Sequence, residues 1–361
     1  MDPIETKIKA LEDFVDRKDQ LKKTAPLQYL FWEATLRCNL ECLHCGSDCV
    51  RDNSTQSGEI GADLVKRELA SIAQLYPPNK ITLAIIGGEP LVRRDIIEVG
   101  EYAAGLGYNW GITTNGMLLD KPMIQRLKDA GLRTISVSLD GVEQDHDKLR
   151  NRPGSHKTVT TAIRNLLDDP FFLTFDIICC VSKINIGRLE EFVEDLVRME
   201  VPAARFTPVF SRGRAGRKNH LTLEKDDYNK MLHFIARQRA QRTGIKIYLS
   251  EEGYWGPEWE CVVRDEFHYC ASGILIGSIL YDGKVTGCPS VSRSFIEGNI
   301  RQTPFVEIWK NRFSRYRGGR KETFGAACAG CEHWILCEGG GFHLLDQANS
   351  PANHCCLKKI G

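Results

Sequence analysis

The sequence "CNLECLHC", residues 38–45, places three cysteines within eight positions, at Cys38, Cys42 and Cys45. It overlaps the end of "QYLFWEATLRC", an apolar run with the composition of a buried strand. Three thiolates at this spacing can bind zinc or an iron–sulfur cluster. A four-iron cluster normally takes four cysteines, so three cysteines leave one iron open to a chelating substrate or cofactor.

Zinc is the alternative for this motif, because structural zinc requires a closed set of four ligands. His44 could provide the fourth ligand, but a chain neighbour of Cys45 does not easily turn toward the same ion. Cys49 could also provide it. The spacing alone therefore leaves both metals open.

The cysteine content is the main anomaly of the composition, with 14 cysteines in 361 residues. The N-terminal stretch mixes both charges and lacks an apolar segment, so we expect no secretory signal and a cytoplasmic protein. Cytosolic thiols stay reduced, which favours metal binding by the clusters at 38–49, 328–337 and 355–356. Cys179 and Cys180 lie in an apolar run and are expected to be buried strand residues.

The remaining composition is that of an ordinary globular protein. Apolar residues make up 42% of the chain and charged residues 26%, enough for a large core and two domains. The formal net charge of +1 does not indicate nucleic acid binding, and no apolar run is long enough to predict a membrane span.

Apolar runs alternate with amphipathic stretches from residue 28 to about residue 210. This alternation predicts six β–α units and a parallel sheet covered by helices, either doubly wound or a partial barrel. The predicted strands are "QYLFWEAT", "ITLAII", "YNWGITT", "RTISVSL", "LTFDIICCV" and "ARFTPVF". In both folds, functional residues gather at the carboxyl ends of the strands.

Polar or glycine-rich motifs follow five of these strands, so we expect the motifs to lie together at one rim of the sheet. They are "CNLECLHC" after the first strand, "GGEP" (87–90) after the second, "TTNG" (113–116) after the third, "SLDG" (138–141) after the fourth and "SRGRAG" (211–216) after the sixth.

A CxxxCxxC motif after the first strand, followed by GGEP, resembles the signature of the radical S-adenosylmethionine (SAM) family. The resemblance covers nearly the whole chain. It implies a partial (β/α)6 barrel in which Cys38, Cys42 and Cys45 hold a 4Fe–4S cluster. The methionine amine and carboxylate of SAM would chelate the fourth iron.

The resemblance also gives the rim motifs roles toward SAM. Gly87 and Gly88 would let the backbone approach the cofactor closely. Glu89 would accept a hydrogen bond from the SAM amine, or act only as the N-terminal acid of the following helix. Asn115 and Ser138 would face the ribose and carboxylate of SAM, or satisfy backbone groups as turn residues.

Three further residues are candidates for SAM binding by the same resemblance. Arg150 would pair with the SAM carboxylate, or form a surface salt bridge. Asn185, after the fifth strand, would contact the ribose or the adenine. His44 stands where the family usually has an aromatic residue, and its backbone is expected to face the adenine.

The segment 261–361 is rich in cysteine, glycine and aromatic residues and resembles the SPASM extension, which carries auxiliary iron–sulfur clusters. A CxxC pair alone often indicates a zinc ribbon. The SPASM pattern is C-x(9–15)-G-x4-C, then CxxC-x5-C-x3-C, then C. The matching residues are Cys270, Gly283, Cys288, Cys328, Cys331 and Cys337.

One position departs from this pattern, because Gly341 stands where a cysteine is expected. The resemblance gives auxiliary cluster I only Cys261, Cys270 and Cys288, with His343 as a candidate replacement for the missing thiolate. The alternatives for this site are a two-iron cluster or no cluster.

Auxiliary cluster II has a full set of predicted ligands. They are Cys328, Cys331, Cys337 and Cys355, with Cys356 as an alternative to Cys355. The chain is thus expected to contain an N-terminal helical segment (1–27), a radical SAM partial barrel (28–215), a helical connector (216–260) and a SPASM domain (261–361).

The resemblance implies an enzyme that cleaves SAM reductively and abstracts hydrogen from a peptide or protein side chain. Its expected partner in electron transfer is a flavodoxin or ferredoxin.

"LFWEATLRCNLECLHCGSDC" and "CEGGGFHL" most resemble a bacterial subgroup encoded beside small lipoproteins. A small-molecule substrate is the alternative. A non-catalytic electron carrier is a third reading, which the GGEP rim disfavours because a carrier needs no SAM pocket.

Overall fold

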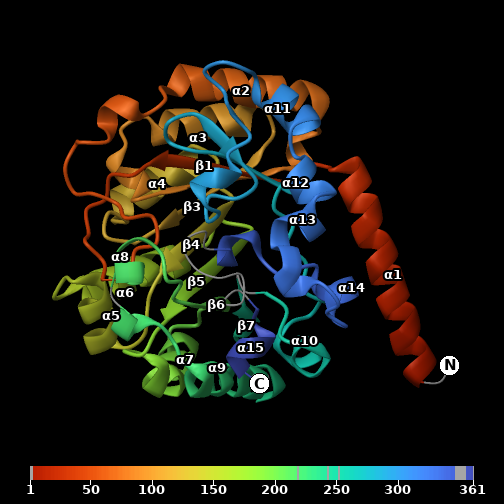
Figure 1. Cartoon of the computed structure of the whole chain (residues 1–361). Helices are drawn as coiled ribbons and strands as arrows, with labels where there is room; N and C mark the ends of the chain where they lie inside the picture. The colour runs from red at the N-terminus through yellow and green to blue at the C-terminus, as the bar shows by residue number, and fades with distance from the viewer. Residues whose placement is uncertain (1–2, 218, 242–243, 251–252, 346–354, 361) are drawn as a thin grey trace.

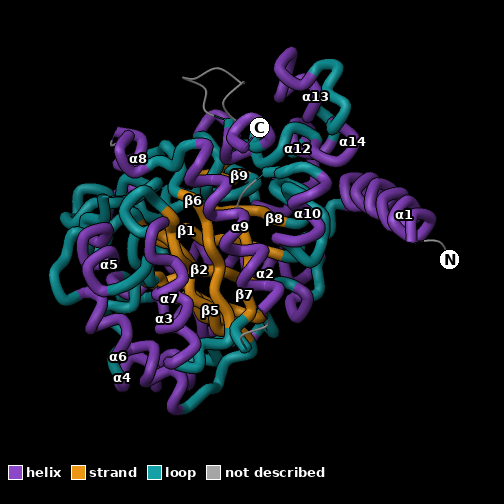
Figure 2. The backbone as a smooth tube through the Cα atoms, turned by 90° about the horizontal axis from the view of Figure 1, so that it is seen from below, coloured by secondary structure: helices purple, strands orange, loops and turns teal. Residues whose placement is uncertain are grey.

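The computed structural model describes residues 3–217, 219–241, 244–250, 253–345 and 355–360. The strands of this described part form one sheet of ten strands in the order β10-β9-β8-β1-β2-β3-β4-β5-β6-β7. Helices surround the sheet in both views (Figures 1 and 2). The strands are β1 (Tyr29–Thr35), β2 (Thr82–Gly87), β3 (Asn109–Thr114), β4 (Thr134–Ser138), β5 (Thr174–Val181), β6 (Ala203–Pro208), β7 (Lys246–Leu249), β8 (Ile276–Ile279), β9 (Lys284–Thr286) and β10 (Gly298–Asn299).

The described helices include those that complete the β–α alternation predicted from the sequence. They are α1 (Pro3–Thr24), α2 (Ala62–Leu75), α3 (Ile96–Gly105), α4 (Lys121–Asp129), α5 (Glu143–Arg150), α6 (Ser155–Asp168), α7 (Leu189–Arg198), α8 (Gly213–Arg217), α9 (Lys225–Gln241), α10 (Pro257–Val263), α11 (Phe305–Asn311), α12 (Ser314–Arg317), α13 (Arg320–Phe324), α14 (Trp334–Cys337) and α15 (Leu357–Ile360).

The six predicted strands are confirmed as β1 to β6, each within two residues at either end. Each strand pairs in parallel with the next one along the chain, so their carboxyl ends share one rim. Apolar side chains such as Trp32 and Trp110 are fully buried in the core. Cys179 is fully buried in β5 as predicted, whereas its neighbour Cys180 is half-buried.

The connector predicted as helical also contains a strand. Its helix α9 is present, but β7 follows it and pairs in parallel with β6. The four-residue sequence "KIYL" was too short to stand out, although its side chains alternate between exposed and buried.

The C-terminal segment continues the same sheet. Strand β8 pairs in parallel with β1, and β9 and β10 add two antiparallel strands. This pairing covers the edge of β1 that would otherwise expose unpaired backbone groups. The predicted second domain therefore begins as an extension of the barrel.

The predicted N-terminal helix is confirmed as α1, which lies beside α14 in both views (Figures 1 and 2). It is more than a solvated helix, because Lys18 is buried and donates to the carbonyl of Ile335 at 2.8 Å. None of the described helices is long and apolar enough to cross a membrane.

Candidate active site

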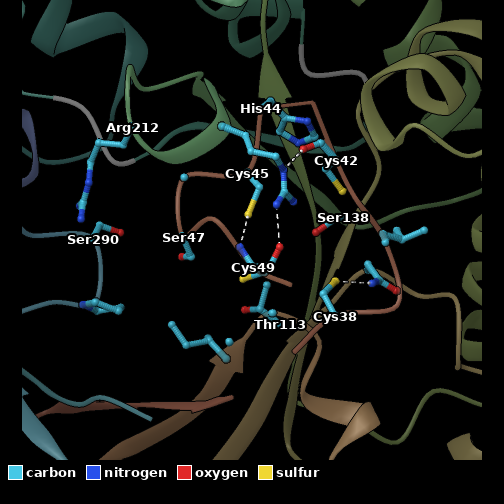
Figure 3. A pocket seen from close by; sticks show the side chains of 18 of the residues that line it. Cys38, Cys42, His44, Cys45, Ser47, Cys49, Thr113, Ser138, Arg212 and Ser290 are labelled. Carbon is cyan, nitrogen blue, oxygen red and sulfur yellow. Dashed lines mark hydrogen bonds between the residues drawn. The ribbon is translucent and has the colours of Figure 1, made fainter. Parts of the chain in front are cut away.

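A cavity of about 260 Å³, here called the barrel cavity, lies at the carboxyl rim of the sheet. All five rim motifs contribute to its wall, which confirms that they gather at one rim. Figure 3 shows the cysteines of the loop 38–45 around the cavity. The wall residues from the motifs are Cys38, Leu40, Cys42, His44, Cys45, Gly87, Gly88, Thr113, Thr114, Asn115, Ser138, Arg212 and Arg214.

Each of the three loop cysteines receives an N–H hydrogen bond at its sulfur. The pairs are Asn115 Nδ2 to Cys38 Sγ (3.7 Å), Arg150 Nη1 to Cys42 Sγ (3.7 Å) and the Cys49 backbone N–H to Cys45 Sγ (3.4 Å). N–H donors favour the thiolate, which is the form that binds iron. The three thiols with these donors fit a cluster that leaves one iron open, while Cys49, a fourth cysteine on the wall, directs its thiol to Cys45.

The protein acts on the three thiols in different ways. Burial raises the pKa of Cys38 to about 11, and burial also raises the pKa of Cys42 although Arg150 opposes it. A hydrogen bond from the Cys49 thiol lowers the pKa of Cys45 to about 5, against the effect of burial. Because metal binding requires deprotonated thiols, iron must offset the burial of Cys38 and Cys42.

Gly87 and Gly88 line the cavity, and the loop after β1 explains why they are glycines. A Cβ at Gly87 would lie 2.3 Å from the Thr35 oxygen, and a Cβ at Gly88 would lie 2.2 Å from the Arg37 oxygen. The close approach is therefore to the backbone that leads into the cysteine loop. The predicted approach to SAM stays a prediction.

Glu89 is fully buried and is not among the described residues of the cavity wall. Its Oε1 accepts from the backbone N–H of Leu91 and from Thr114 Oγ1, and its Oε2 accepts from the N–H of Asn115. Burial raises its pKa despite these bonds. Glu89 thus joins the ends of β2 and β3 and caps the turn at Leu91, the structural alternative named for it.

Asn185 is also buried and lies outside the described cavity wall. Its side-chain amide donates to the carbonyls of Asp140 and Cys180, and its Oδ1 accepts from the N–H of Ser182. The geometry therefore gives its predicted contact with SAM no support, because the amide already holds three backbone groups.

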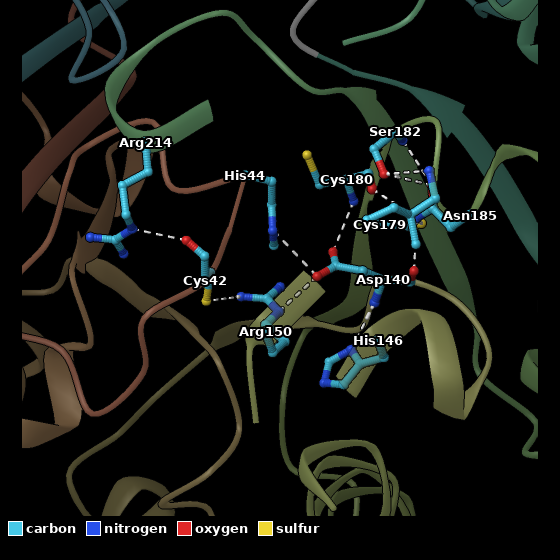
Figure 4. Close-up of polar contacts among 11 residues, drawn as sticks. Cys42, His44, Asp140, His146, Arg150, Cys179, Cys180, Ser182, Asn185 and Arg214 are labelled. Carbon is cyan, nitrogen blue, oxygen red and sulfur yellow. Dashed lines mark hydrogen bonds and ion pairs between the residues drawn. The ribbon is translucent and has the colours of Figure 1, made fainter. Parts of the chain in front are cut away.

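Asp140, in the SLDG motif, is a fully buried carboxylate that the sequence analysis did not single out. Its Oδ2 lies 2.7 Å from Arg150 Nε and 3.3 Å from His44 Nε2, and its Oδ1 accepts from the Cys180 N–H (Figure 4). Burial would raise its pKa, but Arg150 and His44 outweigh burial and lower it. Asp140 therefore stays ionised behind the loop cysteine Cys42.

His44 and Arg150 both line the cavity, and the contact of Arg150 with SAM stays a prediction. The ring of His44 is turned to Asp140, and burial lowers the pKa of this imidazole. Arg150 is buried at 8% exposure and forms no surface salt bridge. The role of the His44 backbone toward the adenine stays a prediction.

Other parts of the cavity wall were missed. Phe210, Pro289, Ser290 and His343 line it together with the motif residues. Figure 3 shows Ser290 across the cavity from Cys38. Pro289 and Ser290 directly follow Cys288, which was predicted as a ligand of auxiliary cluster I. The sequence therefore contained no signal that these two residues line the barrel cavity. The described wall contains three arginines and no aspartate or glutamate.

A second pocket of about 90 Å³, here called the C-terminal pocket, brings together the predicted ligands of auxiliary cluster II. The cysteines that line it are Cys328, Cys331, Cys337, Cys355 and Cys356. Burial raises the pKa of Cys337 to about 12, and the thiols of Cys355, Cys328 and Cys331 add to this effect. Four thiols around one pocket fit a cluster with a full ligand set.

The ligands predicted for auxiliary cluster I are placed less clearly. Cys270 and Cys288 lie in turns that touch, because a Cβ at Gly287 would lie 2.8 Å from the Gly273 nitrogen. Cys270 Sγ lies 3.6 Å from the hydroxyl of Ser272.

Cys261 is exposed at the end of α10 and lies toward the other pocket. Burial, Glu260 and the thiols of Cys337 and Cys261 raise the pKa of Tyr254, a wall residue of the C-terminal pocket, to about 12. The assignment of Cys261 to auxiliary cluster I stays a prediction without geometric support.

The imidazole ring of His343 lies directly against Gly341. A Cβ at Gly341 would lie 2.4 Å from His343 Cε1, so the imidazole fills the space of the missing side chain. The same ring contacts Phe210 edge-on with centroids 4.8 Å apart and lines the barrel cavity. Its role as a replacement ligand stays a prediction.

Curated relatives match most of the chain, and they include a heme synthase and a mycofactocin maturase. The AdoMet-dependent heme synthase of Methanosarcina barkeri (strain Fusaro / DSM 804) is 29% identical over 333 residues, covering 85% of this chain and 89% of the relative. The mycofactocin maturase MftC of Mycobacterium ulcerans (strain Agy99) is 27% identical over 324 residues, covering 86% and 82%.

A solved structure shares the fold. The crystal structure of Streptococcus suis SuiB bound to the precursor peptide SuiA matches with a TM-score of 0.70 at 17% identity, covering 91% of this chain and 74% of SuiB. Residues 32–196 match the radical SAM superfamily, and residues 270–332 match SPASM, an iron–sulfur cluster-binding domain. This chain is therefore a radical SAM enzyme with a C-terminal SPASM domain, and its cofactors are SAM and iron–sulfur clusters.

Proposed function

We propose that Cys38, Cys42 and Cys45 hold the 4Fe–4S cluster that binds SAM, and that the enzyme modifies a side chain of a peptide or protein. The observation that carries this proposal is the convergence of these three thiols on one cavity, each with an N–H donor. A cluster held there would supply the electron for the reductive cleavage of SAM to methionine and a 5′-deoxyadenosyl radical, the species that would take hydrogen from the substrate.

The residues of the chain position SAM and shield the reaction. Arg150 presents a guanidinium group at the cavity wall, which suits the carboxylate of SAM. Asn115 and Ser138 place an amide and a hydroxyl on the same wall. Phe210 and Pro289 add apolar cover, and such cover excludes water that would quench a radical.

The C-terminal pocket would serve electron transfer. Its thiols Cys328, Cys331, Cys337 and Cys355 would hold an auxiliary cluster, which accepts the electron released when a product radical is oxidised. A flavodoxin or ferredoxin would supply the first electron. Oxidation of a peptide side chain needs both steps, which is why two cluster sites in one chain support this proposal.

The peptide class is supported by two of the similar proteins. SuiB was crystallised with a precursor peptide, and MftC is a mycofactocin maturase. We propose a peptide or a small lipoprotein encoded near this enzyme as the substrate, as the subgroup resemblance suggests.

A small anionic molecule is the second candidate, and the cavity wall favours it in one respect. Arg150, Arg212 and Arg214 line the described wall, which has no acidic residue. Arginine pairs well with carboxylates, so a carboxylate-rich small molecule would fit. The similarity to a heme synthase supports the same class.

One experiment separates these candidates. The anaerobically reconstituted enzyme is incubated with SAM and dithionite, together with a synthetic peptide from a neighbouring small lipoprotein gene or with iron coproporphyrin. We expect the peptide to increase 5′-deoxyadenosine release and to change in mass. Stimulation by the porphyrin alone would establish the second candidate. No 5′-deoxyadenosine under any condition would overturn the proposed function.

A further inference from the structure

The three N–H donors to the loop cysteines differ in kind. The donor to Cys45 is a backbone group and the donor to Cys38 is a neutral amide, whereas Cys42 receives the guanidinium of Arg150. A charged donor stabilises negative charge on sulfur more strongly than a neutral one. Of the three donors, Arg150 should therefore have the largest influence on the charge distribution of a cluster bound at Cys38, Cys42 and Cys45.

The guanidinium of Arg150 is held in place by a carboxylate. Arg150 Nε lies 2.7 Å from Asp140 Oδ2, while Arg150 Nη1 points to Cys42 Sγ (Figure 4). Both side chains are at least nine-tenths buried, so neither water nor a surface partner can replace the pair. Asp140 is itself fixed by the Cys180 N–H on its other oxygen.

We propose that Asp140 is a positioning residue that holds Arg150 against Cys42 and thereby raises the reduction potential of the SAM-binding cluster. Reduction adds negative charge to the cluster, and a nearby cationic N–H donor stabilises the reduced form. This inference rests on the proposed function, because it requires a cluster on Cys42.

The sign of the potential shift distinguishes positioning from simple electrostatics. In Asp140→Asn, the asparagine oxygen still accepts from Cys180, but its NH2 group faces Arg150 and can no longer hold it. If Asp140 positions Arg150, this variant lowers the midpoint potential, as Arg150→Gln does. If Asp140 acts only through its own charge, removal of that charge raises the potential, which would overturn the proposal.

The measurement is a redox titration without SAM, followed by the EPR signal that changes when SAM is added. We expect Asp140→Asn and Arg150→Gln to shift the midpoint potential in the same negative direction. The double variant should match Arg150→Gln, because Asp140 acts through Arg150. A double variant that shifts further than Arg150→Gln would contradict this dependence.

The matched control is Asp176→Asn. Asp176 pairs with Arg205 at the amino-terminal end of β5, whereas Asp140 follows the carboxyl end of the neighbouring strand β4. It should leave the potential unchanged. If the Asp140 and Asp176 variants shift it equally, the effect is structural and the proposal fails. If the wild-type enzyme binds no cluster at Cys38, Cys42 and Cys45, the proposed function fails first.

Discussion

The two cysteine sites of this enzyme differ in how they are closed. The barrel cavity, of about 260 Å³, is lined by arginines and by four cysteines, which are the loop cysteines Cys38, Cys42 and Cys45 together with Cys49. The C-terminal pocket, of about 90 Å³, is lined by five cysteines and by the aromatic rings of Tyr254 and Trp334. Fewer thiols in a larger and more polar cavity suit a cluster that must bind SAM, whereas more thiols in a small, mainly apolar pocket suit a cluster that only transfers electrons.

The sites also differ in how they depend on the fold. The cysteine loop follows β1, which pairs with β2 on one side and with β8 on the other. The barrel therefore supports the cysteine loop whether or not metal is bound. The C-terminal pocket is lined by short helices and turns such as α14 and α15. We infer that metal binds to a preformed site at the cysteine loop, whereas metal binding contributes to the folding free energy of the C-terminal pocket.

The largest expected effect is on SAM cleavage. Replacement of Cys38, Cys42 or Cys45 by Ala should each abolish 5′-deoxyadenosine formation, because a cluster with two thiolates is not held. The variants should still fold, as thermal unfolding would show. Cys179→Ala, a buried cysteine outside the described cavity wall, is the control and should retain cleavage. Near-normal cleavage in any of the three loop variants would contradict the ligand assignment.

Removal of all iron should unfold the C-terminal pocket before the barrel. Metal binding contributes on the order of 10 kcal/mol to small metal-binding domains. We expect hydrogen exchange of the chelated protein to show loss of protection in residues 314–345 and 355–360. Strand β8 should stay protected, because it pairs with β1. Equal protection in the pocket and in residues 28–210 would show that the two sites do not differ in this way.

The choice between Cys355 and Cys356 sharpens the description of the C-terminal pocket. The thiol of Cys355 acts on the pKa of both Cys328 and Cys337, whereas Cys356 is buried at 3% exposure, and its Sγ would lie 2.9 Å from a Cβ at Gly253.

Cys355→Ala should therefore lose the iron of the C-terminal pocket, and Cys356→Ala should keep it. Iron and sulfide analysis of the two variants gives the answer. The opposite result would make Cys356 the ligand.

A smaller effect is expected at the contact between α1 and the C-terminal pocket. Lys18 is buried and donates to the Ile335 carbonyl, close to Cys337 in the chain. Lys18→Ala should lower the free energy of unfolding by about 2 kcal/mol, the usual cost of losing a charged hydrogen bond. Chemical denaturation measures this, and the exposed Lys23→Ala should change it little. No difference between the two would mean that α1 does not stabilise the pocket.

The fold and the barrel site were largely predictable, because both depend on local pattern. Apolar runs gave β1 to β6, and the carboxyl ends of parallel strands placed the five motifs at one rim. Nine of the eleven residues predicted as ligands of the SAM-binding cluster or as SAM contacts line the cavity. Glu89 and Asn185 do not, since a polar residue at a strand end can equally well satisfy backbone groups.

The rest depended on contacts between distant parts of the chain. His343 reaches the barrel cavity because Gly341 leaves space for its ring, which no spacing rule reveals. Asp140, in the loop after β4, is fully buried where it accepts from the Cys180 N–H of β5 and pairs with Arg150 of α5. The side of α10 that Cys261 occupies also follows only from tertiary packing.

The most direct test of the difference between the two sites is Mössbauer spectroscopy of the iron-57 enzyme with and without SAM. We predict that SAM changes the signal of one iron, the iron without a cysteine ligand in the cluster on Cys38, Cys42 and Cys45, because SAM would bind to that iron. The signals from the C-terminal pocket should stay the same. Spectra that do not respond to SAM, or that respond at the C-terminal pocket, would contradict the account.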